Sequence, residues 1–257
     1  GSACFQPFNI INSLNGYTEI VDYIVVATKV LNVEDLDLLF LDYTPSSPIV
    51  LIQNGLFIEQ LYMQRFPQLD IISGLAFVCV FRESFTHVRH IDYGRLDLGV
   101  FPSGKLECCD ELVASLQSVG VDARVSECIQ KQRWEKLVRN APFNPLSVIY
   151  EATTLELFDL HQLEPLIRSI MSEVTMCARA DGIILESSII DLKIDQTKRM
   201  TPYKTSMLLD YENQRPIEIQ AILGNLLAFA STHRLDLPTI QVLYDELYLK
   251  ITKERLC

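Results

Sequence analysis

The sequence contains no apolar run approaching the roughly 18 residues that would suggest a transmembrane helix. Its longest apolar stretch, at residues 74–81, is typical of a buried strand. It also has no basic leader followed by an apolar segment and a small-residue cleavage site, so no signal peptide is predicted. Together with a hydrophobic share of 49% and a charged share of 21%, these absences indicate a globular protein, which we expect in the cytoplasm.

Paired cysteines and excess positive charge are also missing. The seven cysteines include no CxxC pair, which argues against a zinc site or a disulfide framework and favours reduced thiols. His87 and His90 lie three apart on an expected strand and face opposite sides, so we predict no metal site there. The net charge of -11 argues against nucleic acid and anionic membranes as partners.

The first half of the chain alternates between strand-like and helix-like segments. Strands are predicted at residues 21–29, 46–55 and 70–81, with helical patterns at 33–43 and 58–67 between them. Such alternation indicates a parallel, doubly wound sheet.

The pattern changes after residue 85. Period-two alternation over 86–101 predicts an antiparallel extension of the sheet, followed by a helix at 106–120 and a short strand at 121–128. Nearly everything beyond has helical spacing, and the expected helices lie at 129–150, 160–181, 187–199, 217–234 and after Pro238. We therefore predict an α/β domain over residues 1–127 and an all-helical domain over residues 128–257.

The segment from Trp134 to Ser147 carries the most informative pattern. Lys136, Asn140 and Asn144 recur every fourth residue and form one polar stripe, beside an apolar stripe that includes Trp134 and Leu137. A cation between neutral amides suits a small, oxygen-rich anion and can give a proton to a carbonyl oxygen. A solvated helix face is the plainer alternative.

Several motifs occur together in one order: LIQNG, SGLAF, WEKLVRNAPFNPLS, TSMLLDYENQRPIEIQAILG and LDLPTIQVLYDEL. In this order they resemble the ketopantoate reductase (2-dehydropantoate 2-reductase) family from about residue 20 to residue 250. The resemblance implies an incomplete Rossmann-like sheet followed by a helical C-terminal domain, as in 6-phosphogluconate dehydrogenase. It also implies NADPH-dependent reduction of a 2-oxo acid, most simply 2-dehydropantoate to pantoate, in pantothenate biosynthesis.

The resemblance also assigns roles to individual residues. It implies that Lys136 is the general acid and that Glu218 is its acidic partner. The substrate-binding positions are Asn140, Asn144 and Ser206. The positions near the cofactor are Asn54, Gly55 and Lys29.

Plainer explanations exist for most of these residues. Asn54 and Gly55 could form a simple turn, and Lys29 could be a solvated loop cation. Glu218 could complement the dipole of a helix that begins at Pro216, and Ser206 could serve as a helix cap. Pro142 removes one amide hydrogen bond and is expected to kink the 129–150 helix.

The glycine-rich turn of dinucleotide-binding folds is not found. The sequence has ten glycines, and no three of them have the GxGxxG spacing. By resemblance, the sequence begins after the strand and turn that would receive the cofactor phosphates. An exposed sheet edge would then favour self-association, for example as a homodimer. Two alternative functions follow: a non-catalytic binding or assembly protein, and a reductase of a different 2-oxo acid.

Overall fold

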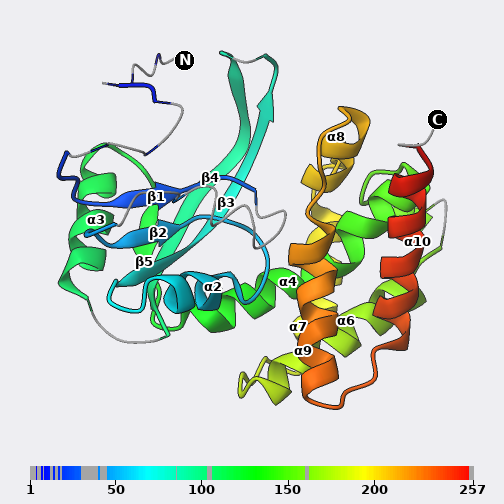
Figure 1. Cartoon of the computed structure of the whole chain (residues 1–257). Helices are drawn as coiled ribbons and strands as arrows, with labels where there is room; N and C mark the ends of the chain where they lie inside the picture. The colour runs from blue at the N-terminus through cyan, green and yellow to red at the C-terminus, as the bar shows by residue number, and fades with distance from the viewer. Residues whose placement is uncertain are drawn as a thin grey trace.

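The computed structural model describes residues 19–29, 40, 45–84, 86–102, 106–159 and 162–254, together with a few positions before residue 19. The expected helix at 33–43 lies outside the described residues except for Phe40. Figure 1 shows a sheet unit and a helical unit side by side, joined by one long helix. None of the described helices has both the length and the apolar character that crossing a membrane requires.

The sheet has five described strands in the order β1-β2-β3-β4-β5. They are β1 (Ile24–Val26), β2 (Ile49–Leu51), β3 (Ile71–Arg82), β4 (Val88–Phe101) and β5 (Ala123–Val125). The first three are parallel, β4 is antiparallel to β3, and β5 is parallel to β4. This confirms the predicted parallel sheet with an antiparallel extension, although β1 and β2 are shorter than the predicted strands at 21–29 and 46–55.

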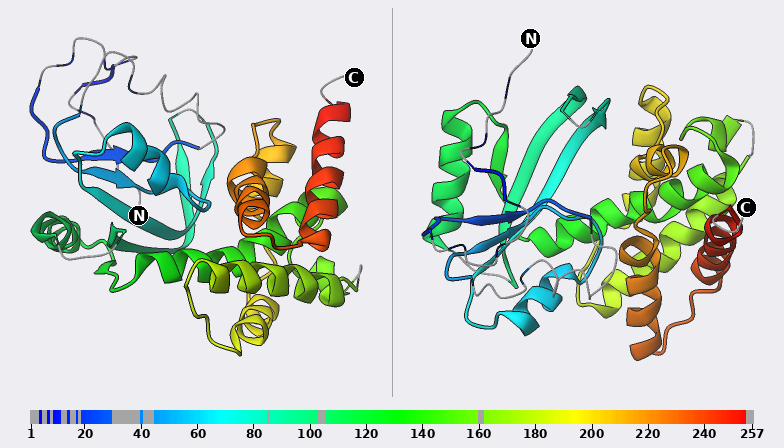
Figure 2. Two further views of the ribbon diagram at one scale, coloured as in Figure 1. Left: turned by 60° about the horizontal axis from the view of Figure 1, so that its bottom comes forward. Right: turned by 45° about the horizontal axis from the view of Figure 1, so that its top comes forward.

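Helices cover both faces of the sheet, because successive residues of a strand point to opposite sides. Ile49 and Leu51 of β2 pack in the core that includes α2 (Ile58–Arg65). Val50 packs in the opposite core with α3 (Glu107–Ser118). Figure 2 shows these helices on the two sides of the sheet. The doubly wound arrangement therefore follows from strands that are apolar on both faces.

The helical unit contains the four predicted helices that follow α4, with two short additions. Its elements are α4 (Ile129–Tyr150), α5 (Glu156–Asp159), α6 (Glu164–Ala180), α7 (Ile189–Arg199), α8 (Ser206–Glu212), the π-helix η1 (Gln220–Gly224), α9 (Asn225–Thr232) and α10 (Pro238–Glu254). The short helices α5 and α8 were not predicted, and the expected helix at 217–234 is observed as η1 followed by α9. The helix α4 spans the predicted residues and continues through Pro142 and Pro145.

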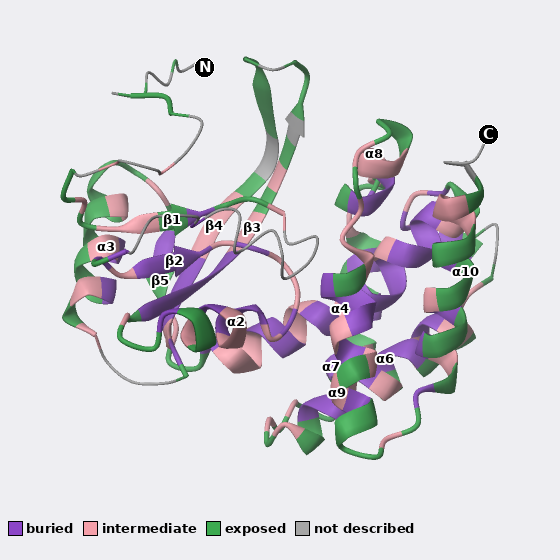
Figure 3. Cartoon of the chain, in the orientation of Figure 1, coloured by how far each residue is buried: buried purple, intermediate pink, exposed green. Residues whose placement is uncertain are grey.

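Helix α4 links the two units. At its start, a Cβ on Gly99 of β4 would lie 2.8 Å from the Cβ of Ile129, so α4 begins in direct contact with the sheet. Further along, Trp134 and Leu137 are buried in the core of the helical unit. Figure 3 shows buried residues continuing along α4 from one unit to the other. We propose a domain division at residue 127, between the end of β5 and the start of α4.

Candidate active site

The site begins where β2 ends and the chain turns toward α2. Gly55 has a φ of 104°, and a Cβ at this position would lie 2.6 Å from the carbonyl oxygen of Ala221 in η1. Only glycine tolerates both the left-handed backbone and this close approach. The Asn54–Gly55 turn expected from sequence is therefore also the place where the sheet unit contacts the helical unit.

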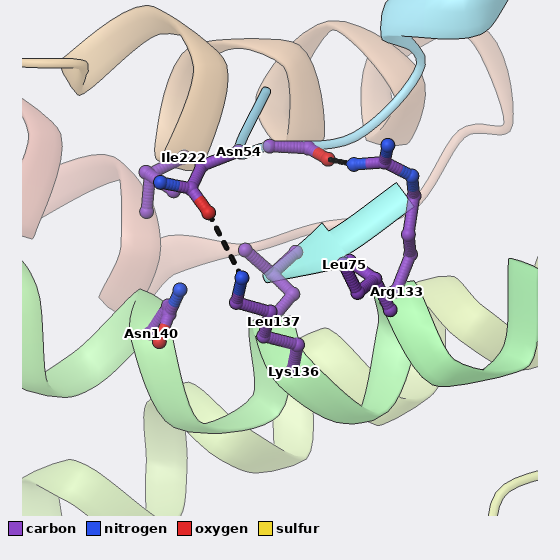
Figure 4. A pocket seen from close by; sticks show the side chains of 8 residues that line it. Asn54, Leu75, Arg133, Lys136, Leu137, Asn140 and Ile222 are labelled. Atoms are coloured by element: carbon purple, nitrogen blue, oxygen red, sulfur yellow. Dashed lines mark hydrogen bonds between the residues drawn. The ribbon is translucent and has the colours of Figure 1, made fainter. Parts of the chain in front are cut away.

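Lys136 of α4 points at this turn. Its ammonium group donates hydrogen bonds to Oδ1 of Asn54 and to the carbonyl oxygen of Ala76 in β3, both at 3.0 Å. It also lies 5.3 Å from the centre of the Phe77 ring. Because an ammonium group has three N–H donors, one can be offered to a ligand after these two contacts. Figure 4 shows the Lys136 and Asn54 side chains directed toward one another.

The surroundings of Lys136 lower the pKa of its ammonium group. Burial lowers the pKa of Lys136 to about 8, and the nearby positive charges of Arg133 and Arg139 act in the same direction. The Glu218 carboxylate partly opposes them. Lys136 therefore carries a proton near neutral pH but releases it more readily than an ordinary lysine, which suits a general acid.

A small recess lies in front of Lys136. It is lined by Asn54, Gly55, Leu75, Arg133, Lys136, Leu137, Asn140 and Ile222. Figure 4 shows Asn140 beside Lys136 on α4, with Asn54 and Ile222 across from them. The lining thus combines two amides and two cations with an apolar wall.

Glu218 lies close to this recess. The residue is half-buried and directly precedes the helical residues that lead into η1. Its carbonyl oxygen accepts a hydrogen bond from the amide of Ile222, a residue that lines the recess. The sequence-based explanation with Pro216 as the first helical residue is wrong, because Pro216 lies in a loop and the helical residues begin at Ile219.

Lys29 reaches the same region from the other unit. It follows β1, pairs with Asp210 of α8 at 2.5 Å and donates to the carbonyl oxygen of Pro216 at 3.1 Å. Lys29 is a loop cation whose side chain is 35% exposed, and its two contacts join the sheet unit to the segment that leads to Glu218.

Asn144 and Ser206 lie beyond the recess lining. Asn144 is half-buried two turns after Lys136, and Ser206 is exposed at the start of α8. The helix cap is Thr205, whose side chain accepts a hydrogen bond from the amide of Leu208 at 3.1 Å, so the explanation of Ser206 as a cap is wrong. Ser147 and Thr205 hydroxyls are 2.6 Å apart and hold α8 against α4.

Sequence reasoning missed Arg133, which is buried beneath the turn. It forms an ion pair with buried Glu59 and hydrogen bonds to Gln53, Gly55, Ser73 and Gly74. One signal was present: Arg133 lies four residues before Leu137, on the apolar stripe of α4, where a cation needs a buried partner.

Comparisons with known proteins agree with this arrangement. The family described as "Ketopantoate reductase PanE/ApbA C terminal" matches residues 128–250, and the one described as "Ketopantoate reductase PanE/ApbA" matches residues 9–103. A 2-dehydropantoate 2-reductase from Nostoc sp. is 34% identical over 245 residues, which cover 91% of this chain and 77% of that protein. The chain covers between 47% and 60% of three other relatives.

Solved structures show the same fold. The crystal structure of 2-dehydropantoate 2-reductase from Methylococcus capsulatus is 35% identical, with a TM-score of 0.86 over 95% of this chain and 78% of that one. A D-mandelate dehydrogenase solved with NADH and anilino(oxo)acetate is 21% identical, with a TM-score of 0.82 over 93% of this chain and 79% of that one, and is similar in fold. The Rossmann-like sheet unit and the helical unit are thus those of an oxidoreductase family. The chain belongs to the ketopantoate reductase family.

Proposed function

We propose that this chain reduces the C2 carbonyl of a 2-oxo acid to a hydroxyl group, with 2-dehydropantoate as the preferred substrate. The observation that carries the proposal is the Lys136 ammonium group, held at 3.0 Å from the Asn54 amide oxygen at the edge of a small recess. Family membership supports the reaction class.

A nicotinamide cofactor would supply the hydride. The residues suited to hold it are Lys29, Asn54 and Gly55, which follow β1 and β2, because ligands of open α/β sheets bind beyond the carboxyl ends of the strands. We propose NADPH as the donor, with NADH, which was bound to the similar D-mandelate dehydrogenase, as the alternative.

The protein supplies the proton and the orientation. Lys136 donates a hydrogen bond, and then its proton, to the carbonyl oxygen as hydride reaches C2, so a ketone becomes a secondary alcohol. Glu218 supports the protonated form of Lys136. Asn140 binds polar groups of the acid in the recess, and Asn144 and Ser206 extend this polar path along α4 and α8. Local cations offset the net charge of -11, which would otherwise repel an acid.

Oxidation of NADPH, followed by its absorbance, tests the proposal with 2-dehydropantoate and a panel of other 2-oxo acids. Lys136→Ala should lower kcat by about 100-fold to 10,000-fold, the usual contribution of a general acid. Lys198→Ala is the matched control, because Lys198 pairs with Glu164 on the helical surface. Full turnover by Lys136→Ala would refute the mechanism. NADPH binding without turnover of any acid would favour the non-catalytic alternative.

The predicted homodimer is a separate matter. Light scattering of the purified chain measures its mass in solution and tests that prediction directly.

A further inference from the structure

Arg133 is a buried cation whose contacts surround the Asn54 turn. Arg133 is 4% exposed, and Glu59, its ion-pair partner, is 1% exposed. Its Nε donates to the Ser73 hydroxyl at 2.9 Å, and that hydroxyl donates to Glu59 at 2.5 Å. The buried guanidinium group thus has a carboxylate partner, as a buried ion requires.

The Nη1 atom of Arg133 forms hydrogen bonds with the main chain on both sides of Asn54. It donates to the carbonyl oxygen of Gln53 at 3.0 Å and to that of Gly55 at 3.1 Å. These two carbonyls flank Asn54, so the position of the Asn54 side chain follows from the position of the guanidinium group. A lysine could not make this set of contacts, because its single ammonium lacks the planar fork.

Other groups secure the next residues of the turn. The Leu56 amide donates to the Ala221 carbonyl oxygen at 3.3 Å, and Asn225 donates to the Leu56 carbonyl oxygen at 2.9 Å. The Phe57 ring stacks on Phe229 with 4.9 Å between ring centres. The turn is therefore held by η1 and α9 beyond Gly55, whereas Arg133 holds it at Asn54.

Arg133 and Lys136 also share one rigid element. They are three residues apart on α4, and Lys136 donates to Asn54 while Arg133 fixes the backbone of Asn54. Figure 4 shows both cations rising from α4 toward the same turn. Arg133 therefore links the helix that carries Lys136 directly to the backbone on both sides of Asn54.

We propose that Arg133 is a positioning residue for the reduction: it places Asn54 opposite Lys136 and adds positive charge behind the ammonium group. This inference rests on the proposed function and extends it to a residue outside the catalytic set. Of the charges that act on Lys136, Arg133 is the strongest, ahead of Glu218 and Arg139, and it favours release of the proton.

Two variants separate the two parts of the proposal. Arg133→Lys keeps the charge but loses the fork, so kcat should fall by about 100-fold, as for a small misplacement of reacting groups. The KM for the acid should change little, and the pH at which activity falls should stay near 8. In the double variant Arg133→Met with Glu59→Gln, charge and partner are removed together, which avoids an unpaired buried carboxylate. In that variant the pKa of Lys136 should rise.

The pKa of Lys136 can be read without any catalysis. Competitive acetylation with acetic anhydride across a pH series, followed by peptide mass spectrometry, gives the midpoint at which Lys136 becomes reactive. The control is Arg168→Met with Glu164→Gln, which makes the same two substitutions at a partly exposed Arg–Glu pair on α6, outside the site. The control should leave both the midpoint and kcat unchanged.

The outcomes are distinct once rates are corrected for the folded fraction, measured by circular dichroism. Unchanged kcat in Arg133→Lys together with an unchanged Lys136 midpoint in the double variant would show that Arg133 only stabilises the fold, and would overturn the inference. A shifted midpoint in a protein whose wild type reduces no 2-oxo acid would refute the proposed function while leaving the coupling between Arg133 and Lys136 established.

Discussion

The low pKa of Lys136 predicts a decline of activity at mildly alkaline pH. The reduction needs Lys136 protonated, and its pKa is lowered to about 8 by burial and by neighbouring cations. Activity should therefore be lost as the pH rises through about 8, not through the ordinary value of 10.5. The relevant quantity is kcat/KM, which reports the free enzyme.

The size of the effect follows from the protonated fraction. With a pKa of about 8, kcat/KM should halve near pH 8 and fall to about one tenth of its plateau near pH 9. A lysine with the ordinary value of 10.5 would keep nearly full activity there. The lowered pKa corresponds to about 3 kcal/mol of destabilisation of the charged group in the folded protein.

The measurement is a pH series of kcat/KM with saturating NADPH in buffers of constant ionic strength. Lys136→Arg is the control, since its guanidinium stays charged throughout the range and its residual rate should not show the decline. A wild-type profile that stays flat to about pH 9.5, or a decline that persists unchanged in Lys136→Arg, would refute the reasoning.

Three further predictions concern stability. Protonated Lys136 is penalised only in the folded state, so the free energy of unfolding of the wild type should rise by up to about 3 kcal/mol relative to Lys136→Met as the pH goes from about 8 to about 10.5. Urea unfolding at each pH measures this, and an equal pH dependence of the two proteins would contradict it. Gly55→Ala should destabilise by more than Gly182→Ala, since both have positive φ but only Gly55 faces a backbone atom within 4 Å, and a comparison of urea midpoints tests it. Thr205→Ala should lower the free energy of unfolding by about 1 kcal/mol, because Thr205 is the helix cap. Ser206→Ala should leave the unfolding midpoint nearly unchanged but raise the KM for the acid in steady-state assays.

Most of the fold was predicted from the periodic spacing of apolar residues. The predicted helix at 129–150 coincides with α4, and the predicted strand at 70–81 differs from β3 by one residue at each end. Such patterns are local, because burial of one face imposes a fixed spacing. The ends of β1 and β2 could not be predicted equally well, because a short parallel strand ends where its neighbour and the following turn dictate.

The candidate site was predictable in part. Lys136 and Asn140 were placed together by helical spacing, and Asn54 was placed at a strand end. The contacts of Arg133 join residues 59 to 80 positions apart in the chain, which no local pattern reveals. The partner of Lys29 was hidden for the same reason, since Asp210 belongs to another unit.

The site depends on the number of residues in the π-helical turn η1. A π-turn holds one more residue than an ordinary helical turn. Such a turn takes in one extra residue while the segments on either side keep their orientation, so deleting one residue from Gln220–Gly224 would reduce η1 to an ordinary turn. Ala221, which accepts from Leu56, and Ile222, which lines the recess, could then no longer both keep their places, so a deletion at this point is as damaging as a substitution in the recess.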